Sequence, residues 1–278
     1  MLIGNYILGQ QIGKGNDSSC YLVKKEEELY CLKLVTLVAE SEDGKKERIE
    51  REIEILKILN ANENVIKLEE SFILKNNYLE RICVITEMMQ MDLSKYIEAF
   101  KGKLTEKRGR KISQQLMDGI NYCHQLMVVH QDIKMENITI DAQSGKIKII
   151  DFGMSCIATS EEEISNMKES KGTPLYICPQ KCTRSEYDGR KSDVWSCGIL
   201  IYRMLTGIFP FGEGCKTLKE LCCSIVYDDF PISTKFSSPL ISFLNNILSK
   251  NEEQRFFAFE ALQHPWLKDS QEVVEQKD

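Results

Sequence analysis

The sequence predicts an α+β fold with two lobes, a small antiparallel β-sheet lobe carrying one helix and a larger, mainly helical lobe. The first 90 residues contain β-rich segments and one strong helical segment, whereas beyond Gln90 the apolar residues recur at helical spacing. All six prolines lie at or after Pro174, so the two parts also differ in composition. A chain of 278 residues is long enough for one large domain or two small lobes.

The β-rich part has one predicted helix at 46–59, where Ile49 and Ile53 belong to an apolar series that recurs between charged residues. A charged stretch at 24–28 is expected to form an exposed turn between two strands. The expected strands are runs rich in β-branched, aromatic and other apolar residues: 7–11, 20–23, 29–35, 65–74 and 78–87.

The rest of the chain predicts helices and two short strands. Helices are expected at 93–100 and 106–126, although Gly109 costs about 1 kcal/mol relative to alanine and weakens the start of the second. The segment 194–205 is nearly all apolar, which indicates a helix buried on all sides, and Asp193 before it is a natural N-cap. The short strands are expected at 138–140 and 147–150.

The composition is that of a soluble globular protein, with 42% hydrophobic and 28% charged residues. A net charge of −6 disfavours nucleic-acid binding. No apolar run reaches the roughly 18 residues that a membrane span needs, and the N-terminus has no signal-peptide pattern. Three successive glutamates at 161–163 are expected to form a solvated loop tip.

The eleven cysteines, an odd number, lie between Cys20 and Cys223, and many of them sit inside apolar runs. This pattern indicates free, buried thiols in a reducing compartment, so a cytoplasmic location is expected. A zinc site using Cys178 and Cys182, or the adjacent pair at 222–223, is the sharper alternative. With three histidines and no CxxC pair, the spacing does not favour it.

The most informative motif joins Asp132, Asn137 and Asp151. Asn137 follows Asp132 by five positions in the sequence HQDIKMEN, and Asp151 begins an Asp-Phe-Gly sequence fourteen residues later. This is the arrangement that phosphoryl transfer from ATP requires: one carboxylate orients the attacking hydroxyl, and the amide and the second carboxylate hold magnesium ions that bridge the phosphates. Lys134 would stabilise charge on the transferred phosphoryl group.

A glycine-bearing loop and a strand lysine lie upstream. Gly13 and Gly15 lie between two predicted strands, where glycines let backbone amides approach phosphate oxygens. A glycine-bearing hairpin turn explains this pattern equally well. Lys33 lies in an otherwise apolar strand, where a lysine is costly to bury unless it is paired. Glu52, nineteen residues on, is the candidate partner, and a solvent-facing strand lysine is the alternative.

Together these motifs resemble the catalytic domain of eukaryotic protein kinases over residues 6–267. Later segments extend the resemblance, because Gly-Thr-Pro at 172–174 is similar to the end of an activation segment and Asp-Val-Trp at 193–195 to the start of a buried helix. The segments 205–211 and 264–266 are typical of the calmodulin-dependent and AMP-activated kinase group.

The resemblance implies ATP with Mg²⁺ in a cleft between the lobes, and transfer of the γ-phosphoryl group to a protein substrate. Lys134, two places after Asp132, is typical of serine/threonine kinases and not of tyrosine kinases. The implied organisation is a kinase domain at 1–267, with an N-terminal lobe at 1–86, a hinge at 87–91 and a C-terminal lobe at 92–267, followed by a polar tail at 268–278.

The resemblance also implies the site residues. Catalytic roles fall to Asp132, Lys134 and Thr173, and magnesium binding to Asn137 and Asp151. Cys20 and Cys31 stand where the family usually has valine and alanine. The implied nucleotide-binding residues are Ile12, Gly13, Gly15, Cys20, Cys31, Lys33, Glu52, Thr86, Glu87, Met89 and Asp92.

Two departures from the family pattern concern regulation. Gln131 replaces the arginine that usually binds a phosphate on the activation segment, and Glu169 stands where many relatives have the phosphate acceptor. We therefore hypothesise an enzyme that is active without the usual activation-loop phosphorylation. The alternative is that Ser170 or Thr173 is phosphorylated and read by another cation.

Two further departures concern rigidity. Gln180 replaces a glutamate that usually pairs with a buried arginine, here Arg255, which predicts a less rigid activation segment. Ser18 takes the place of a third loop glycine and is expected to stiffen the loop.

Two other function classes are compatible with such a fold. A pseudokinase scaffold would bind ATP without efficient transfer, but such proteins usually lose one of the charged motif residues, all of which are present here. A small-molecule kinase is the second class. The Gly-Thr-Pro and Asp-Val-Trp segments, which shape a peptide groove in the family, argue against it.

Overall fold

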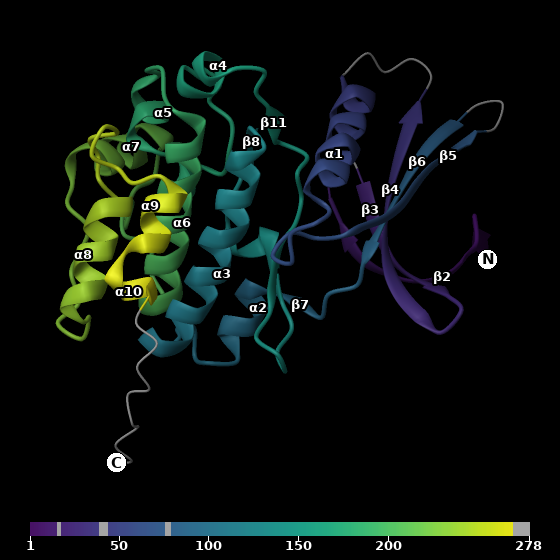
Figure 1. Ribbon diagram of the computed structural model, residues 1–278, viewed down its shortest axis with the longest axis horizontal. Helices are drawn as coiled ribbons and strands as arrows, with labels where there is room; N and C mark the ends of the chain where they lie inside the picture. The colour runs from purple at the N-terminus through teal and green to yellow at the C-terminus, as the bar shows by residue number, and fades with distance from the viewer. Residues whose placement is uncertain (16–17, 39–43, 76–78, 269–278) are drawn as a thin grey trace.

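The computed structural model describes residues 1–15, 18–38, 44–75 and 79–268, and it has the two lobes that the sequence predicts (Figure 1). One lobe holds a six-stranded sheet and helix α1, and the other holds the remaining helices. The predicted polar tail, apart from Lys268, lies outside the described residues. None of the described helices is long and apolar enough to cross a membrane.

The sheet of the N-terminal lobe is antiparallel, with the strand order β1-β2-β3-β4-β6-β5. The predicted turn at 24–28 shrinks to two residues because strand pairing continues up to it, and Glu26 has a φ of 53° there. β5 begins at Leu68 because Val65 instead bridges Ile149 of the other lobe. The strands are β1 (Leu2–Ile3), β2 (Tyr6–Lys14), β3 (Ser18–Lys25), β4 (Glu28–Val38), β5 (Leu68–Lys75) and β6 (Leu79–Glu87).

Helix α1 (Lys45–Leu59) confirms the predicted helix and packs in the lobe that holds the sheet (Figure 1). Its buried positions recur at helical spacing, and Ile55 and Leu59 are completely shielded from solvent. Glu52 lies three positions before Ile55, so it shares this inward face and is 4% exposed. The amphipathic pattern therefore carries a carboxylate into the interior along with the apolar side chains.

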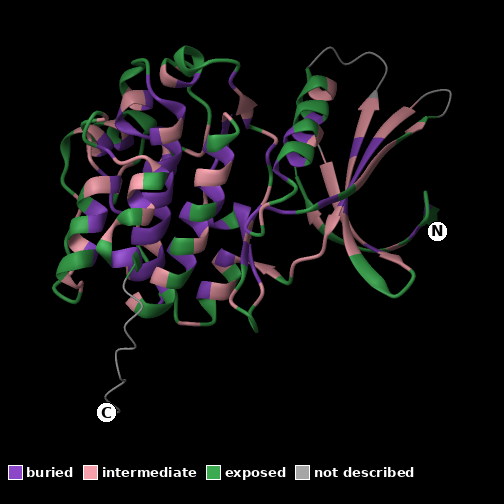
Figure 2. Cartoon of the chain, viewed as in Figure 1, coloured by how far each residue is buried: buried purple, intermediate pink, exposed green. Residues whose placement is uncertain are grey.

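The C-terminal lobe is organised around helix α6, which is buried along most of its length (Figure 2). The C-terminal lobe also has two small sheets of short strands. One contains β7 (Met91–Asp92), β9 (Ile138–Ile140) and β10 (Ile147–Ile149), and the other contains β8 (Val128–Val129) and β11 (Cys156–Ile157). The helices are α2 (Leu93–Glu98), α3 (Glu106–Gln125), α4 (Glu161–Ser165), α5 (Pro179–Thr183), α6 (Gly189–Thr206), α7 (Leu218–Tyr227), α8 (Ser238–Ile247), α9 (Ala258–Gln263) and α10 (Pro265–Lys268).

Gly109 has a packing reason that the sequence alone does not show. A Cβ at this position would lie 2.4 Å from Cδ2 of Leu205, so the glycine lets α3 approach α6 closely. The helix still starts as predicted, because the side chain of Thr105 caps it by accepting a hydrogen bond from Arg108 N. Close helix packing thus offsets the propensity cost of the glycine.

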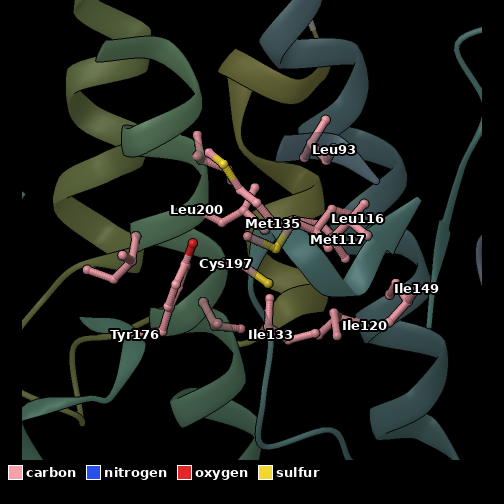
Figure 3. Close-up of a cluster of buried hydrophobic side chains, with 14 of the residues drawn as sticks. Leu93, Leu116, Met117, Ile120, Ile133, Met135, Ile149, Tyr176, Cys197 and Leu200 are labelled. Carbon is pink, nitrogen blue, oxygen red and sulfur yellow. The ribbon is translucent and has the colours of Figure 1, made fainter. Parts of the chain in front are cut away.

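A core between α3, α6 and the segment after Asp132 supports the site (Figure 3). Ile133 is fully shielded from solvent and Met135 is 3% exposed. Burying each such side chain contributes roughly 1.5–3 kcal/mol. Lys134 lies between these two buried side chains and Asp132 lies directly before Ile133, so both residues stand on a segment that is anchored in the core.

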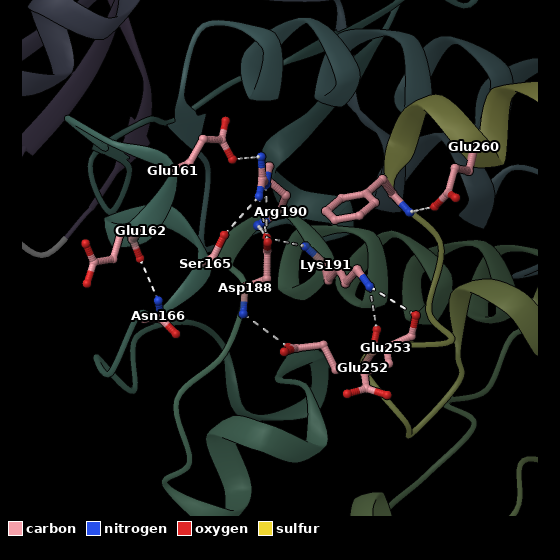
Figure 4. A network of polar contacts seen from close by, with 11 residues as sticks. Glu161, Glu162, Ser165, Asn166, Asp188, Arg190, Lys191, Glu252, Glu253 and Glu260 are labelled. Carbon is pink, nitrogen blue, oxygen red and sulfur yellow. Dashed lines mark hydrogen bonds and ion pairs between the residues drawn. The ribbon is translucent and has the colours of Figure 1, made fainter.

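The predicted N-cap of the buried helix is wrong. α6 begins at Gly189, and Asp188 caps it by accepting hydrogen bonds from Arg190 N at 2.8 Å and Lys191 N at 3.4 Å (Figure 4). The charged first turn can be buried because Lys191 Nζ donates to the carbonyl of Glu252 at 2.7 Å. Since that partner is distant in the sequence, the apolar pattern alone places the helix start too late.

The glutamates at 161–163 form the first turn of α4, so the predicted loop is also wrong. Ser160 caps the helix by accepting a hydrogen bond from Glu163 N at 3.2 Å. Carboxylates in the first turn also stabilise a helix, because they interact favourably with the positive end of its dipole. Glu161 also pairs with Arg190 at 2.8 Å (Figure 4). The acidic run is therefore exposed but structured.

Candidate active site

A cleft of about 450 Å³ lies between the lobes. Strands β2 to β4 line one side, and the segments after β6 and around β9 line the other. All the predicted nucleotide-binding residues except Gly13 line it. Gly13 pairs with Cys20 inside the sheet, beside a register shift, and so belongs to the strand instead of the loop. The predicted residues that line the cleft are Ile12, Gly15, Cys20, Cys31, Lys33, Glu52, Thr86, Glu87, Met89 and Asp92.

Lys33 contacts two carboxylates. Its Nζ lies 2.6 Å from Glu52 Oε1 and 3.2 Å from Asp151 Oδ1, so the predicted Lys33–Glu52 pair forms. Burial disfavours the ammonium, but Glu52 and Asp151 outweigh burial and raise the pKa of Lys33 above its usual value. Lys33 is therefore a fixed positive charge in the cleft.

Asp151 and Asn137 supply the oxygen atoms expected to hold magnesium. Burial would raise the pKa of Asp151, but the Lys33 ammonium lowers it below its usual value, which keeps the carboxylate charged. Asn137 donates from Nδ2 to Asp132 O at 2.9 Å and to Asp132 Oδ2 at 3.2 Å, which fixes its amide. Both residues line the cleft. A carboxylate and an amide oxygen fit Mg²⁺, a hard cation that prefers oxygen ligands.

Asp132, Lys134 and Thr173 meet as a triangle. Thr173 Oγ1 donates to Asp132 Oδ1 at 2.7 Å, and Lys134 Nζ lies 2.6 Å from Asp132 Oδ2 and 3.1 Å from Thr173 Oγ1. Asp132 is only 6% exposed. The three predicted catalytic residues therefore lie together, with the activation segment tied to the carboxylate through Thr173.

Asp193 holds the backbone of this loop. Its two carboxylate oxygens accept from His130 N at 2.8 Å, from Gln131 N at 2.9 Å and from His124 Nε2 at 3.1 Å. Burial would raise the pKa of Asp193, but the bonds from His124 and His130 lower it. Gln131 has a φ of 67°, an unfavourable conformation for a residue with a side chain. Asp193 thus stabilises the strained turn just before Asp132.

The side chains of Glu87 and Asp92 have structural partners. Glu87 accepts from Lys67 N at 2.7 Å and pairs with Lys148 at 2.7 Å. Asp92 caps α2 by accepting from Lys95 N at 2.9 Å. Both residues border the cleft, yet these bonds hold their carboxylates to the protein itself.

The cleft also includes residues that were not predicted. Thr139 lies in β9, two residues after Asn137, and Ile150 lies between the end of β10 and Asp151. The sequence predicts strands at 138–140 and 147–150, so the position of these two residues beside the motifs could have identified them. The other unpredicted lining residues are Lys14, Ser18, Leu56, Ile66, Val84, Met88, Gln90, Met91 and Glu136.

Gln180 contacts Arg255 as the sequence predicts. Arg255 Nη2 donates to Gln180 Oε1 at 3.0 Å, and Gln180 Nε2 donates to the carbonyl of Lys250 at 2.9 Å. Arg255 is 1% exposed, and burial lowers its pKa. Gln180 therefore serves two partners, of which a glutamate could serve only the first.

The Gln180→Glu variant should be more stable than the parent. The bond from the Arg255 guanidinium already involves a charged group and contributes about 1.5–3 kcal/mol, whereas a buried ion pair costs about 3–5 kcal/mol to break. The gain at Arg255 is therefore about 2 kcal/mol, and it exceeds the loss of the neutral bond to Lys250, about 0.5–1.5 kcal/mol, by about 1 kcal/mol. Thermal unfolding should shift upward by about 2–4 °C. Gln180→Ala, which removes both bonds, is the control and should unfold at a lower temperature. A fall for Gln180→Glu as well would show that the Lys250 bond dominates.

Residues 6–267 match the family model of the protein kinase domain. The chain belongs to the protein kinase family. It is 34% identical to CBL-interacting serine/threonine-protein kinase 17 of Arabidopsis thaliana, over 96% of this chain and 61% of that protein. It is 33% identical to CBL-interacting protein kinase 21 of Oryza sativa subsp. japonica, over 96% of this chain and 50% of that protein.

A third relative, CBL-interacting serine/threonine-protein kinase 1 of Arabidopsis thaliana, is 32% identical over 96% of this chain and 59% of its own length. The kinase domain thus spans between half and about three fifths of these relatives. Family membership confirms the bilobal kinase fold and implies the general use of ATP and Mg²⁺.

Proposed function

We propose that this kinase domain transfers the γ-phosphoryl group of ATP to serine or threonine hydroxyls of protein substrates. The observation that carries the proposal is the Asp132–Lys134–Thr173 triangle beside the cleft residue Asn137. The relatives are named serine/threonine-protein kinases, which supports the same acceptor class. The charged residues needed for transfer form two groups, one in which Lys33 contacts Glu52 and Asp151 and one in which Lys134 contacts Asp132. Their presence in these contacts disfavours a scaffold without activity.

Each residue of the site has a proposed task. Lys33 would orient the nucleotide phosphates, and Asn137 and Asp151 would hold Mg²⁺, which when bound neutralises phosphate charge. Asp132 would orient the acceptor hydroxyl and take up its proton. Lys134 would stabilise charge on the transferred group, since its Nζ lies between Asp132 and Thr173.

We also propose the finer assignments of domain and group. The division into lobes at 1–86 and 92–267 with a hinge at 87–91 agrees with the end of β6 at Glu87 and the start of β7 at Met91. The segments 205–211 and 264–266 support placing the domain close to the calmodulin-dependent and AMP-activated kinases.

We propose further that activity does not require phosphorylation of the activation segment. Three contacts hold the segment without a phosphate. Tyr187 Oη donates to the carbonyl of Glu169 at 2.6 Å, Lys181 Nζ donates to the carbonyl of Lys171 at 2.9 Å, and Met167 exchanges two backbone bonds with Tyr187. Lys181 is 5% exposed, so its bond is shielded from water. Gln131 lies where an arginine would read a phosphate, and it donates instead to Cys156 Sγ at 3.3 Å.

The test is transfer by the phosphatase-treated chain to a generic basic protein, with Mg²⁺ and labelled ATP, beside Asp151→Asn as the inactive control. We expect transfer that the control lacks, and a Ser170→Ala protein within about twofold of the parent, because surface substitutions away from structural contacts usually change little. A treated protein that is inactive until Ser170 or Thr173 is phosphorylated would contradict the phosphorylation-independent state. Absence of transfer in every form would contradict the kinase proposal.

A further inference from the structure

Two cysteines lie together on the strands above the cleft. On the antiparallel pair β3 and β4, Cys20 lies opposite Lys33, and Leu22 lies opposite Cys31. Residues directly opposite one another point to the same face of a sheet, and so do residues two apart on one strand. Cys20 and Cys31 are therefore diagonal neighbours on the face that carries Lys33, and both line the cleft.

The two thiols are not equivalent. The Cys31 side chain hydrogen-bonds to that of Cys20, and this bond together with the nearby Lys33 ammonium lowers the pKa of Cys20 to about 7, against the effect of burial. The same bond and burial raise the pKa of Cys31. Burial also raises the pKa of Cys83, on the neighbouring strand β6, although the Arg81 guanidinium acts in the opposite direction. Cys20 lies directly opposite Lys33, whereas Cys31 lies two positions from Lys33 on the same strand, so the ammonium is nearer to Cys20. Since the thiolate is the nucleophilic form, Cys20 is the reactive member of the pair.

We propose that Cys20 is a covalent modification site inside the nucleotide cleft, activated by Cys31, and that its modification and nucleotide binding exclude each other. The inference rests on the proposed nucleotide site, because Cys20 and Lys33 face the same space. A group attached to the Cys20 sulfur occupies part of the volume that the nucleotide would fill. In turn, a bound nucleotide covers the sulfur.

Hydrogen peroxide and alkyl halides are the two classes of reagent that fit. With peroxide, the Cys20 thiolate attacks one oxygen, the O–O bond breaks and the leaving hydroxide takes a proton to become water. Sulfur is oxidised by two electrons to the sulfenic acid as the peroxide is reduced. With iodoacetamide, an S–C bond forms and iodide leaves.

A disulfide between Cys20 and Cys31 is not the expected product. Diagonal neighbours on an antiparallel pair have Cα atoms about 7–8 Å apart. A disulfide needs a Cα separation below about 7 Å. The sulfenic acid is therefore expected to persist until a thiol reduces it.

The first experiment labels the whole, nucleotide-free chain with a limiting amount of iodoacetamide at pH 7 and locates the adducts by peptide mass spectrometry. Cys223, which is exposed, is the internal reference. A thiol of pKa about 7 should react about threefold faster than an ordinary thiol, since its larger thiolate fraction exceeds its lower nucleophilicity. Saturating Mg²⁺-ATP should slow Cys20 at least tenfold and leave Cys223 unchanged. Unlabelled Cys20 beside fully labelled Cys223 would overturn the proposal.

The second experiment measures nucleotide affinity before and after peroxide, and again after dithiothreitol. We expect a loss of at least tenfold that dithiothreitol reverses, in the parent and in the control Cys223→Ser. The Cys20→Val protein should have the same nucleotide affinity before and after peroxide. In the labelling experiment, Cys31→Ala should slow the labelling of Cys20 to the rate of Cys223. These two substitutions introduce the residues that the family usually has. Unchanged affinity after complete modification of Cys20 would overturn the proposal.

The experiments distinguish a failure of the proposed function from a failure of the proposal for Cys20. If the untreated chain binds no nucleotide, the proposed function is contradicted, and the exclusion between modification and nucleotide falls with it. The assignment of Cys20 as a site activated by Cys31 is then still decided by the labelling ratio and by Cys31→Ala. If nucleotide binds but does not protect Cys20, the proposed function stands and the further inference fails.

Discussion

Asp132→Asn should lower phosphoryl transfer by about 10²–10⁴-fold, the contribution typical of general acid–base catalysis, and should change thermal stability little. The amide keeps the size of the carboxylate but cannot accept a proton from the acceptor hydroxyl. One oxygen of Asp132 accepts from Thr173 at 2.7 Å, and that hydroxyl can rotate to accept a hydrogen bond instead. If the amide nitrogen of the variant side chain turns toward Thr173, its oxygen remains available to Lys134.

Nucleotide affinity separates this catalytic effect from a general loss of structure. Asp132 is absent from the residues that line the described cleft, so ADP affinity should stay within about threefold of the parent. Asp118→Asn, on the exposed face of α3, is a matched control that should keep the full rate. An Asp132→Asn protein with near-normal transfer would remove Asp132 from its proposed role, whereas a large fall in melting temperature would make the residue structural.

The motifs predicted the cleft well because the residues that define it recur at fixed spacing along local elements. Lys33 and Glu52 were paired from a nineteen-residue step, and their atoms lie 2.6 Å apart. The strands and long helices were predicted because each has one apolar face, which leaves a period in the sequence. The start of α6 is predicted too late because a partner distant in the sequence, Glu252, decides the local structure. The loop predicted at 161–163 is wrong for a local reason, the cap that Ser160 supplies to α4.

Other elements could have been found but were not. α7 begins with a capping box: the Thr217 side chain accepts from Glu220 N, and the Glu220 side chain accepts from the backbone N–H of Thr217. The four residues from Thr217 to Glu220 form a local motif that can be recognised in the sequence. By contrast, β8 and β11 are two residues each and exist only because their segments meet in the fold. No local pattern distinguishes such strands from loops.

Asp193→Asn is the same chemical change as Asp132→Asn, but it should lower thermal stability strongly, whereas Asp132→Asn should change thermal stability little. Both Asp193 oxygens accept from backbone N–H groups of His130 and Gln131, which cannot reverse their direction as a hydroxyl can. The amide nitrogen of the variant side chain must therefore face one of these two N–H groups, and Asp193 is only 1% exposed, so water cannot relieve the mismatch. Breaking a buried charged contact costs about 3–5 kcal/mol, so the melting temperature should fall by at least about 6 °C.

The rate should fall as well, because the strained backbone of Gln131 loses its bond and Asp132 follows it in sequence. Circular dichroism melts and transfer assays of one preparation test both effects. A variant that melts like the parent would show that the two backbone bonds do not hold the loop.

The pH dependence of folding stability gives a third, independent test of the role of Asp193. Its pKa in the folded protein lies below the ordinary 3.8, so its charged form stabilises the fold. That contribution is fully present above the unfolded pKa and is lost as the pH falls through the folded pKa. The stability gap between parent and Asp193→Asn should therefore be constant from pH 7 to about 5 and narrow below 3.8. A gap that stays constant on acidification would mean that the amide costs stability only through its altered hydrogen bonds and that the charge of Asp193 contributes nothing.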